Sequence, residues 1–282
     1  MQADLARRIA AAVGAEVSVF RTVAGGDIND AYTVELADAR RLFVKTNRAA
    51  PPGMFAAEAG GLRWLAEARA VRVPEVIAVA EDFLALEWLE RGPRRRGFDE
   101  ALGRGLARLH RASPGGFGLA ADNYIATLPQ ANHPEPDWIA FWMRQRIEPM
   151  VRRAIERRDA PARWASAVAR LAARLPDLAG PAEPPARLHG DLWHGNVHAA
   201  GDEPALIDPA VYGGHREVDL AMLALFGGLS DALVGGYQEV WPLAPGWRDR
   251  LVLWQLYPLL VHVVLFGNGY GGQVERVLER FA

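Results

Sequence analysis

Two short stretches decide the fold of this chain: HGDLWHGN at residues 189–196 and ALIDP at residues 205–209. They place Asp191 and Asn196 five residues apart, and Asp208 twelve residues after Asn196. In phosphoryl transfer, one carboxylate orients the attacking hydroxyl and accepts its proton, while an amide oxygen and a second carboxylate hold Mg²⁺ against the phosphates. A strand-loop-strand hairpin would bring all three side chains to one end of a sheet. The spacing therefore predicts Asp191 as the base, with Asn196 and Asp208 as the metal ligands.

Lys45 is the single lysine among 32 basic residues. A compact ammonium neutralises phosphates when a carboxylate holds its flexible stem, although chance retention in an arginine-rich composition is a second explanation. Lys45 ends the predicted strand RLFVK and Glu58 lies in the predicted helix that follows, so we expect the two to pair. Gly25 and Gly26 separate two predicted strands, where residues without a Cβ let backbone N–H groups approach a phosphate closely.

The pattern of apolar residues divides the chain into an amino-terminal sheet and a mainly helical remainder. Strands are predicted where β-branched and aromatic residues gather between turn residues, over residues 17–23, 31–36, 41–46, 76–80 and 83–89. Helices are predicted from the apolar periodicity, over the first 17 residues and residues 54–70, 101–111, 138–158, 163–175, 218–226 and 248–265. The predicted fold class is therefore α+β.

The composition of the chain indicates which partners and which cellular compartment to expect. A net charge of −2 gives no basic surface for nucleic acid or an anionic membrane, so neither partner is expected. The absence of cysteine excludes disulfides and thiolate metal sites and fits a cytoplasmic protein. The amino terminus lacks the apolar run of a signal peptide. The apolar run at residues 251–266 is shorter than the roughly 20 residues that a bilayer needs, so we predict a buried helix there.

Three histidines near the catalytic motif allow an alternative interpretation, in which they form a zinc site. His189, His194 and His198 lie within ten residues, and imidazole is a common metal ligand. The intervening Gly195 and Asn196 argue against a helix that would align them. We therefore favour the phosphotransfer interpretation.

The order of these motifs resembles the protein-kinase-like superfamily, and within it the fructosamine kinase (ketosamine 3-kinase) family. The resemblance covers nearly the whole chain. It is carried by the segments GGDIND (25–30), FVKTNR (43–48), MFAAEAGGL (54–62), HGDLWHGNV (189–197), DPAVYGGHREVDLAML (208–223) and FGNGY (266–270). It implies a bilobal fold, with an ATP-binding lobe at residues 1–90, a catalytic and substrate-binding lobe at residues 91–282, and ATP and Mg²⁺ between them.

The resemblance also implies a role for each matching residue. Asp191 would be the catalytic base, Asn196 and Asp208 the Mg²⁺ ligands, and Trp193 a platform for the sugar. His189 and Asp219 are expected to hold the catalytic loop through hydrogen bonds. The residues expected to bind the nucleotide are Gly25, Gly26, Asp27 and Ile28 of the first loop, the pair Lys45 and Glu58, and the hinge of Glu87, Trp88 and Leu89.

The implied reaction is phosphorylation of the 3-hydroxyl of a ketosamine, either free or on a glycated lysine, and the implied purpose is protein deglycation. One alternative keeps the kinase and changes the acceptor to an aminoglycoside, choline or homoserine, because those kinases share the HGD loop. Another is a catalytically silent nucleotide-binding module, which would have lost Lys45, Asp191 or Asp208, and all three are present. The protein is expected to be a monomer or a weak dimer.

Overall fold

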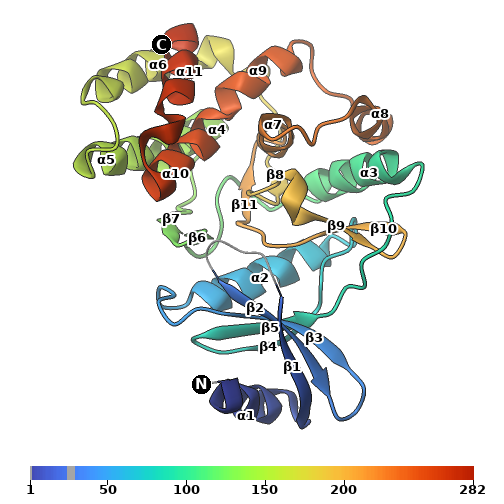
Figure 1. Cartoon of the computed structure of the whole chain (residues 1–282). Helices are drawn as coiled ribbons and strands as arrows, with labels where there is room; N and C mark the ends of the chain where they lie inside the picture. Colours follow the sequence, from blue (N-terminus) through green and yellow to red (C-terminus); the bar gives the residue numbers. More distant parts are fainter. Residues whose placement is uncertain (1, 24–28) are drawn as a thin grey trace.

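A computed structural model describes residues 2–23 and 29–282 of the chain. Its amino-terminal lobe is built on one antiparallel sheet in the order β1-β2-β3-β5-β4 (Figure 1). The strands are β1 (Val17–Val23), β2 (Asp30–Leu36), β3 (Arg41–Thr46), β4 (Val76–Val79) and β5 (Phe83–Glu87). All five lie where the sequence predicts strands. The expected bilobal α+β fold is confirmed, while a domain boundary at residue 90 stays a prediction.

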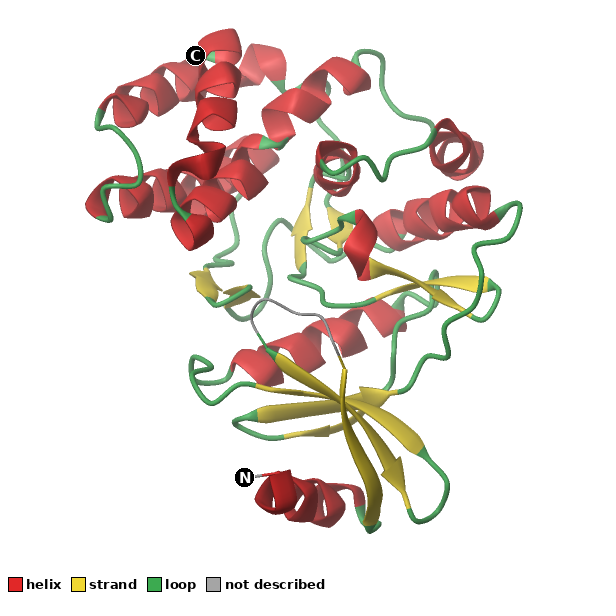
Figure 2. Ribbon diagram, in the orientation of Figure 1, coloured by secondary structure: helices red, strands yellow, loops and turns green. Residues whose placement is uncertain are grey.

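Two helices cover opposite faces of this sheet, α1 (Gln2–Val13) and α2 (Met54–Glu67) (Figures 1 and 2). Alternate residues of a strand point to opposite faces. Phe83 and Ala85 of β5 therefore join the apolar cluster of α1, and Leu84 and Leu86 join that of α2. Because Val44 belongs to the α1 side, its neighbour Lys45 points toward α2 and the second lobe.

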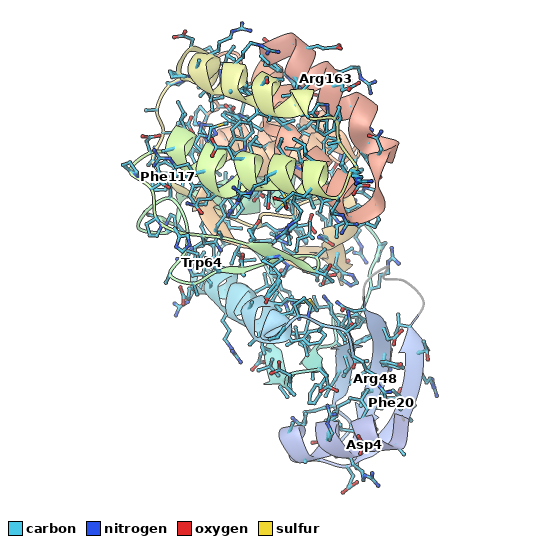
Figure 3. The ribbon with its side chains drawn as sticks, turned by 90° about the vertical axis from the view of Figure 1, so that its left-hand side faces the viewer. Asp4, Phe20, Arg48, Trp64, Phe117 and Arg163 are labelled. Carbon is cyan, nitrogen blue, oxygen red and sulfur yellow. The ribbon has the colours of Figure 1, made fainter. Side chains whose placement is uncertain are left out.

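The carboxy-terminal lobe is mainly helical and holds the largest core of the protein. Its helices are α3 (Phe98–Arg111), α4 (Trp138–Phe141), η1 (Trp142–Ile147), α5 (Glu148–Glu156), α6 (Arg163–Leu178), η2 (His194–Asn196), α7 (Glu217–Leu225), α8 (Asp231–Val240), α9 (Trp247–Trp254), α10 (Leu256–Phe266), η3 (Asn268–Tyr270) and α11 (Gly271–Phe281). Figure 3 shows Arg163 at the start of α6, far from Asp4 and Phe20 in the sheet lobe, and Trp64 of α2 near the junction of the lobes.

Some helix boundaries differ from the sequence prediction. The predicted helix at residues 138–158 is interrupted by η1, a turn of π-helix, and the predicted helix at residues 248–265 is divided at Gln255 into α9 and α10. α8 and α11 were not predicted, because paired glycines weaken their helical pattern. α8 is stabilised by its amino-terminal cap, since the Ser230 hydroxyl accepts a hydrogen bond from the Leu233 amide at 3.1 Å.

Two glycines allow α3 and α8 to cross at close range. A Cβ on Gly103 would lie 2.0 Å from the Leu233 carbonyl oxygen, and one on Gly236 would lie 2.2 Å from that of Glu100. Real Cβ atoms do not approach an oxygen so closely, so only glycine permits this packing. The crossing fixes α8 against α3, which also contacts β8 and β10.

Three short antiparallel strand pairs carry the loops between these helices. β8 (Ala186–Leu188) pairs with β11 (Tyr212–Gly214), and β9 (Val197–Ala200) pairs with β10 (Glu203–Leu206). The second pair is enclosed in sequence by the first. The third pair, β6 (Asn123–Ile125) with β7 (Leu128–Gln130), forms a hairpin between α2 and α10 in Figure 1.

The stretch Trp247–Phe266 is long and apolar enough to cross a membrane, with a mean hydropathy of 1.3. However, 67% of it is buried inside the fold, and its two helices pack in the main core. This agrees with the predicted buried helix.

Candidate active site

The loop that carries Asp191 follows β8 directly and is anchored from α7. Asp219, which is fully buried, accepts hydrogen bonds from the backbone N–H groups of His189 at 2.8 Å and Gly190 at 2.9 Å. Gly190 has a φ of 83°, and a Cβ there would lie 2.0 Å from the Ala210 carbonyl oxygen. The sharp turn therefore requires glycine, and it holds Asp191 in a fixed position.

His189 connects this loop to the strand that ends before Asp208. Its Nε2 lies 2.9 Å from the Ile207 carbonyl oxygen, and its Nδ1 accepts from the Asp191 amide at 3.3 Å. Burial lowers the pKa of His189, which leaves the ring neutral with its proton on Nε2. Both His189 and Asp219 therefore hold the loop through hydrogen bonds, as the sequence predicts.

The β9–β10 hairpin brings the second and third predicted residues to the same place. Asn196 precedes β9 and Asp208 follows β10, and the backbone between them is closed by a hydrogen bond from the Ile207 amide to the Asn196 carbonyl at 3.1 Å. The side-chain amide Nδ2 of Asn196 donates to the Asp191 carbonyl at 2.8 Å and lies 3.3 Å from Asp191 Oδ2. Asn196 and Asp191, which lie twelve and seventeen positions before Asp208, thus come close to it at one end of the hairpin.

Lys45 joins the two lobes at this point. Its Nζ lies 2.7 Å from Glu58 Oε1 and 2.6 Å from Asp208 Oδ1, and the residue is 5% exposed. Burial on its own would lower the pKa of Lys45, but the charges of Asp208 and Glu58 outweigh it and the pKa is raised. The ammonium is therefore permanently charged beside two carboxylates, as phosphate binding requires.

Asp191 has an unusual proton affinity for a carboxyl group. Burial raises its pKa to about 7, with a further contribution from the negative charge of Asp208. A carboxyl group with a raised pKa in a cleft is typical of a general acid or base. Glu58 also has its pKa raised by burial, against the opposing charge of Lys45.

A cavity of about 600 Å³ connects Lys45 and Glu58 with Asp191, Asn196 and Asp208. Asn29, Lys45 and Glu58 line it from the amino-terminal lobe, and Asp191, Asn196 and Asp208 line it from the other. One side of the cavity forms an aromatic wall, which consists of Trp193, Phe226, His262, Phe266 and Tyr270, and most of the other lining residues are apolar.

The aromatic wall contains residues that the sequence prediction missed, apart from Trp193. His262 has its ring centroid 5.3 Å from that of Phe226 and 4.7 Å from that of Tyr270. Burial lowers the pKa of His262, so the wall carries no charge at neutral pH. The FGNGY motif was the available signal, because it places Phe266 and Tyr270 directly after an apolar helix.

The predicted hinge is not brought to this cavity, and the predicted glycine-containing loop is not described. Gly25, Gly26, Asp27 and Ile28 lie outside the described residues. The hinge of Glu87, Trp88 and Leu89 begins at the last residue of β5 but does not line the cavity. The Glu87 carboxylate binds Arg72 at 2.6 Å, and the Leu89 carbonyl oxygen lies 3.2 Å from His198 Nε2. Adenine binding at the hinge therefore stays a prediction.

The comparison with known protein families decides the identity of this arrangement. The sequence model named fructosamine kinase matches residues 1–282. The chain belongs to the fructosamine kinase family. Members of the fructosamine kinase family are ATP-dependent phosphotransferases with a hydroxyl group as acceptor, so this chain is an enzyme of that class and uses ATP.

Individual relatives agree with membership of the fructosamine kinase family. A probable ketoamine kinase of Thermus thermophilus is 40% identical over 255 residues, which cover 90% of this chain and 91% of the relative. A chloroplastic protein-ribulosamine 3-kinase of Oryza sativa subsp. indica is 36% identical over 270 residues, covering 92% and 78%.

Solved structures extend the likeness to the fold. A Thermobifida fusca protein, described as a candidate fructosamine-3-kinase, superposes with a TM-score of 0.91 at 43% identity, covering 98% of this chain and 97% of that one. A macrolide 2'-phosphotransferase of Brachybacterium faecium superposes with a TM-score of 0.64 at 17% identity, covering 99% and 97%. The second likeness shows the kinase-like fold alone.

The chemistry of the donor set fits Mg²⁺, which kinases of this fold use with ATP. Within residues 2–23 and 29–282, no three His, Asp or Glu side chains form a metal cluster. Mg²⁺ does not need one, because one or two protein oxygens suffice when nucleotide phosphates supply others. Asn196 uses its Nδ2 within the loop, which leaves its Oδ1 for a cation. Asp208 binds Lys45 through Oδ1, which leaves Oδ2.

Proposed function

We propose that this enzyme transfers the γ-phosphoryl group of ATP to the 3-hydroxyl of ketosamines such as fructosamines and ribulosamines. The substrate is either a free ketosamine or one on a glycated protein lysine. The relatives named ketoamine kinase and protein-ribulosamine 3-kinase support this acceptor class. In the family the 3-phosphate is unstable and is eliminated, so we propose that the enzyme deglycates proteins.

One observation carries the proposal: Lys45, Asp191 and Asp208 share a single cavity with the uncharged aromatic wall. Phosphoryl transfer needs positioning and charge neutralisation more than covalent chemistry. The charged half of the cavity suits the phosphates of ATP. The aromatic half suits the apolar face of a sugar and its amino substituent.

The chain's own residues divide the reaction between them. Lys45, held by Glu58, binds phosphate oxygens of ATP. Asn196 and Asp208 would hold Mg²⁺, which neutralises charge on the phosphates when it is bound. Asp191 hydrogen-bonds the 3-hydroxyl and accepts its proton as the oxygen bonds to the γ-phosphorus and the bond to the leaving ADP breaks.

Trp193 is the residue that we propose to contact the sugar. It lies two residues after Asp191, lines the cavity and is 36% exposed. Its ring lies 6.1 Å from that of Phe226 between centroids, so part of its orientation is set by packing. An exposed indole face beside the base can stack on a sugar ring.

The test is ATP consumption with Mg²⁺ and a panel of acceptors: fructoselysine, ribuloselysine, an aminoglycoside, choline and homoserine. We expect turnover with the ketosamines and phosphate at their 3-position, located by NMR. Asp191→Asn should retain the fold and lose about 10²–10⁴-fold in kcat, because base and orientation are lost while the shape remains. Turnover only with another acceptor would keep the kinase and refute deglycation, and ATP binding without any turnover would favour a silent module.

We further propose that the enzyme acts in the cytoplasm as a monomer or weak dimer, without nucleic-acid or membrane partners. The absence of cysteine and the small net charge support this. Sedimentation at several protein concentrations would test the assembly state.

A further inference from the structure

The β6–β7 hairpin lies between the two halves of the proposed site and supplies none of the reacting groups. In Figure 1 it is found between α2 of the sheet lobe and α10 of the helical lobe. Tyr124, Ile125 and Ala126 at its tip line the cavity. Asn123, Tyr124 and Gln130 of the hairpin bind the segment after Asp208 and the start of α2, which carries Glu58.

On the side of the helical lobe, two buried amides bind the backbone immediately after Asp208. Asn123 Nδ2 donates to the Val211 carbonyl at 2.8 Å, and Gln130 Nε2 donates to the Ala210 carbonyl at 3.2 Å. The Ala210 amide in turn donates to the His189 carbonyl at 2.9 Å. The segment after Asp208 is therefore held between the hairpin and the catalytic loop.

These amides are themselves fixed by buried partners. Gln130 Nε2 also donates to Asn123 Oδ1 at 2.8 Å, and Gln130 Oε1 accepts from the Tyr257 hydroxyl at 2.7 Å. Asn132 Nδ2 donates to Asn123 Oδ1 at 2.9 Å. Gln130 is 1% exposed and Asn132 is fully buried. A buried polar group that loses its hydrogen-bond partner costs free energy, because it has left water without a replacement bond. Side chains in a network where every group has a partner are therefore held in one orientation.

On the side of the sheet lobe, the same hairpin binds the start of α2. The Tyr124 hydroxyl donates to the Pro52 carbonyl at 2.8 Å, two residues before α2 begins, and its ring packs against the apolar cluster between α2 and the sheet. α2 carries Glu58, the partner of Lys45. Farther along α2, a Cβ on Gly61 would lie 3.2 Å from the Val211 side chain, so α2 also packs on the segment after Asp208.

We propose that the β6–β7 hairpin is a positioning element, which sets the location of Asp208 relative to the Lys45–Glu58 pair. The inference rests on the proposed function, in which Asp208 is a Mg²⁺ ligand and Lys45 binds phosphate. Gln130 positions Asp208 through the Ala210 carbonyl, and Tyr124 positions Glu58 through the start of α2. Neither side chain takes part in the chemistry.

The experiment compares buried Gln130 with half-buried Gln255, each of which donates a side-chain hydrogen bond to a backbone carbonyl. Gln130→Met removes the donor to the Ala210 carbonyl, whereas Gln255→Met removes a donor to the Ala221 carbonyl at 3.2 Å, away from the cavity. MgATP affinity is measured by calorimetry, Tm by thermal denaturation, and kcat and KM with a ketosamine. We expect Gln130→Met to weaken MgATP binding about tenfold, the equivalent of one buried hydrogen bond. Gln255→Met should lower Tm and leave the affinity unchanged.

Tyr124→Phe provides a second variant, which keeps the ring and loses only the bond to the Pro52 carbonyl. It should raise the Kd of MgATP about threefold, with the KM for ketosamine unchanged. If both hairpin variants bind MgATP as tightly as wild type does, the inference is overturned and the proposed function stays intact. Wild-type protein that failed to bind MgATP would overturn both.

Discussion

Replacing Lys45 by methionine tests the buried charge arrangement at the lobe junction. Methionine matches the length of the stem and removes the ammonium, which leaves Glu58 with a 14% exposed side chain and no cation. Breaking a buried pair in this way typically costs about 3–5 kcal/mol. Asp208 is less affected, because its side chain is 43% exposed and keeps contact with water.

Protonation of Glu58 sets an upper limit on this loss. Neutralising a carboxyl group of ordinary pKa, about 4.3, costs about 3.7 kcal/mol at pH 7, at about 1.36 kcal/mol per pH unit. We therefore expect Lys45→Met to lower the free energy of unfolding by about 3 to 3.7 kcal/mol at pH 7.

The pH dependence of the loss has a definite sign. Without Lys45, the folded-state pKa of Glu58 lies above its unfolded value, because burial raises it and no cation opposes this. The folded variant then binds a proton that the unfolded chain does not, so its stability recovers as pH falls. The deficit relative to wild type should shrink to under about 2 kcal/mol at pH 5.5.

Urea unfolding followed by tryptophan fluorescence at pH 7 and 5.5 measures both values. Arg104→Met is the matched control, because Arg104 pairs with Glu239 at 3.0 Å on the surface. Exposed pairs contribute under about 1 kcal/mol, and this loss should be alike at both pH values. A Lys45→Met deficit as small as the control, or one that grows on acidification, would refute the reasoning.

Three further predictions concern packing, substrate and metal. Gly236→Ala should lower the free energy of unfolding by about 1–3 kcal/mol, because the added Cβ meets the Glu100 carbonyl. At the neighbouring Gly235 a Cβ meets nothing within 4 Å, so Gly235→Ala should raise the free energy of unfolding by up to about 1 kcal/mol. Chemical denaturation measures both variants, and an equal loss of stability in the two would contradict the prediction. Trp193→Leu should raise the KM for ketosamine about fivefold and leave the KM for ATP unchanged, because the stacking surface for the sugar is lost. A raised KM for ATP with an unchanged KM for ketosamine would show that Trp193 does not stack on the sugar. Asp208→Asn, which tolerates the φ of 57° at this position, should raise the Mg²⁺ concentration for half-maximal activity about 10–100-fold. An unaltered Mg²⁺ titration would argue against Asp208 as a ligand.

Local sequence patterns predicted most of the elements that position the site. β1 and β3 have the predicted bounds of residues 17–23 and 41–46, because their strand residues lie between clear turn residues. The break at Gln255 and the π-helical turn η1 do not show in the apolar periodicity. Their sequence signals are Pro258 and Pro149, because a proline has no N–H for the backbone hydrogen bond four residues back.

The sequence by itself determined the chemistry of the site. Asp191, Asn196 and Asp208 occur within 18 residues of chain, and the β9–β10 hairpin brings Asn196 and Asp208 together. The residue types and their order were therefore sufficient to predict a base and two oxygen ligands.

Only the tertiary structure decided which distant groups meet them. Lys45 contacts Asp208 across 163 positions of sequence, and His262 and Tyr270 reach the cavity from the far end of the chain. The β6–β7 hairpin, which no motif marked, binds both α2 and the segment after Asp208. Such contacts depend on how two lobes pack against each other, and that packing is set by the summed burial of many side chains, which no local spacing encodes.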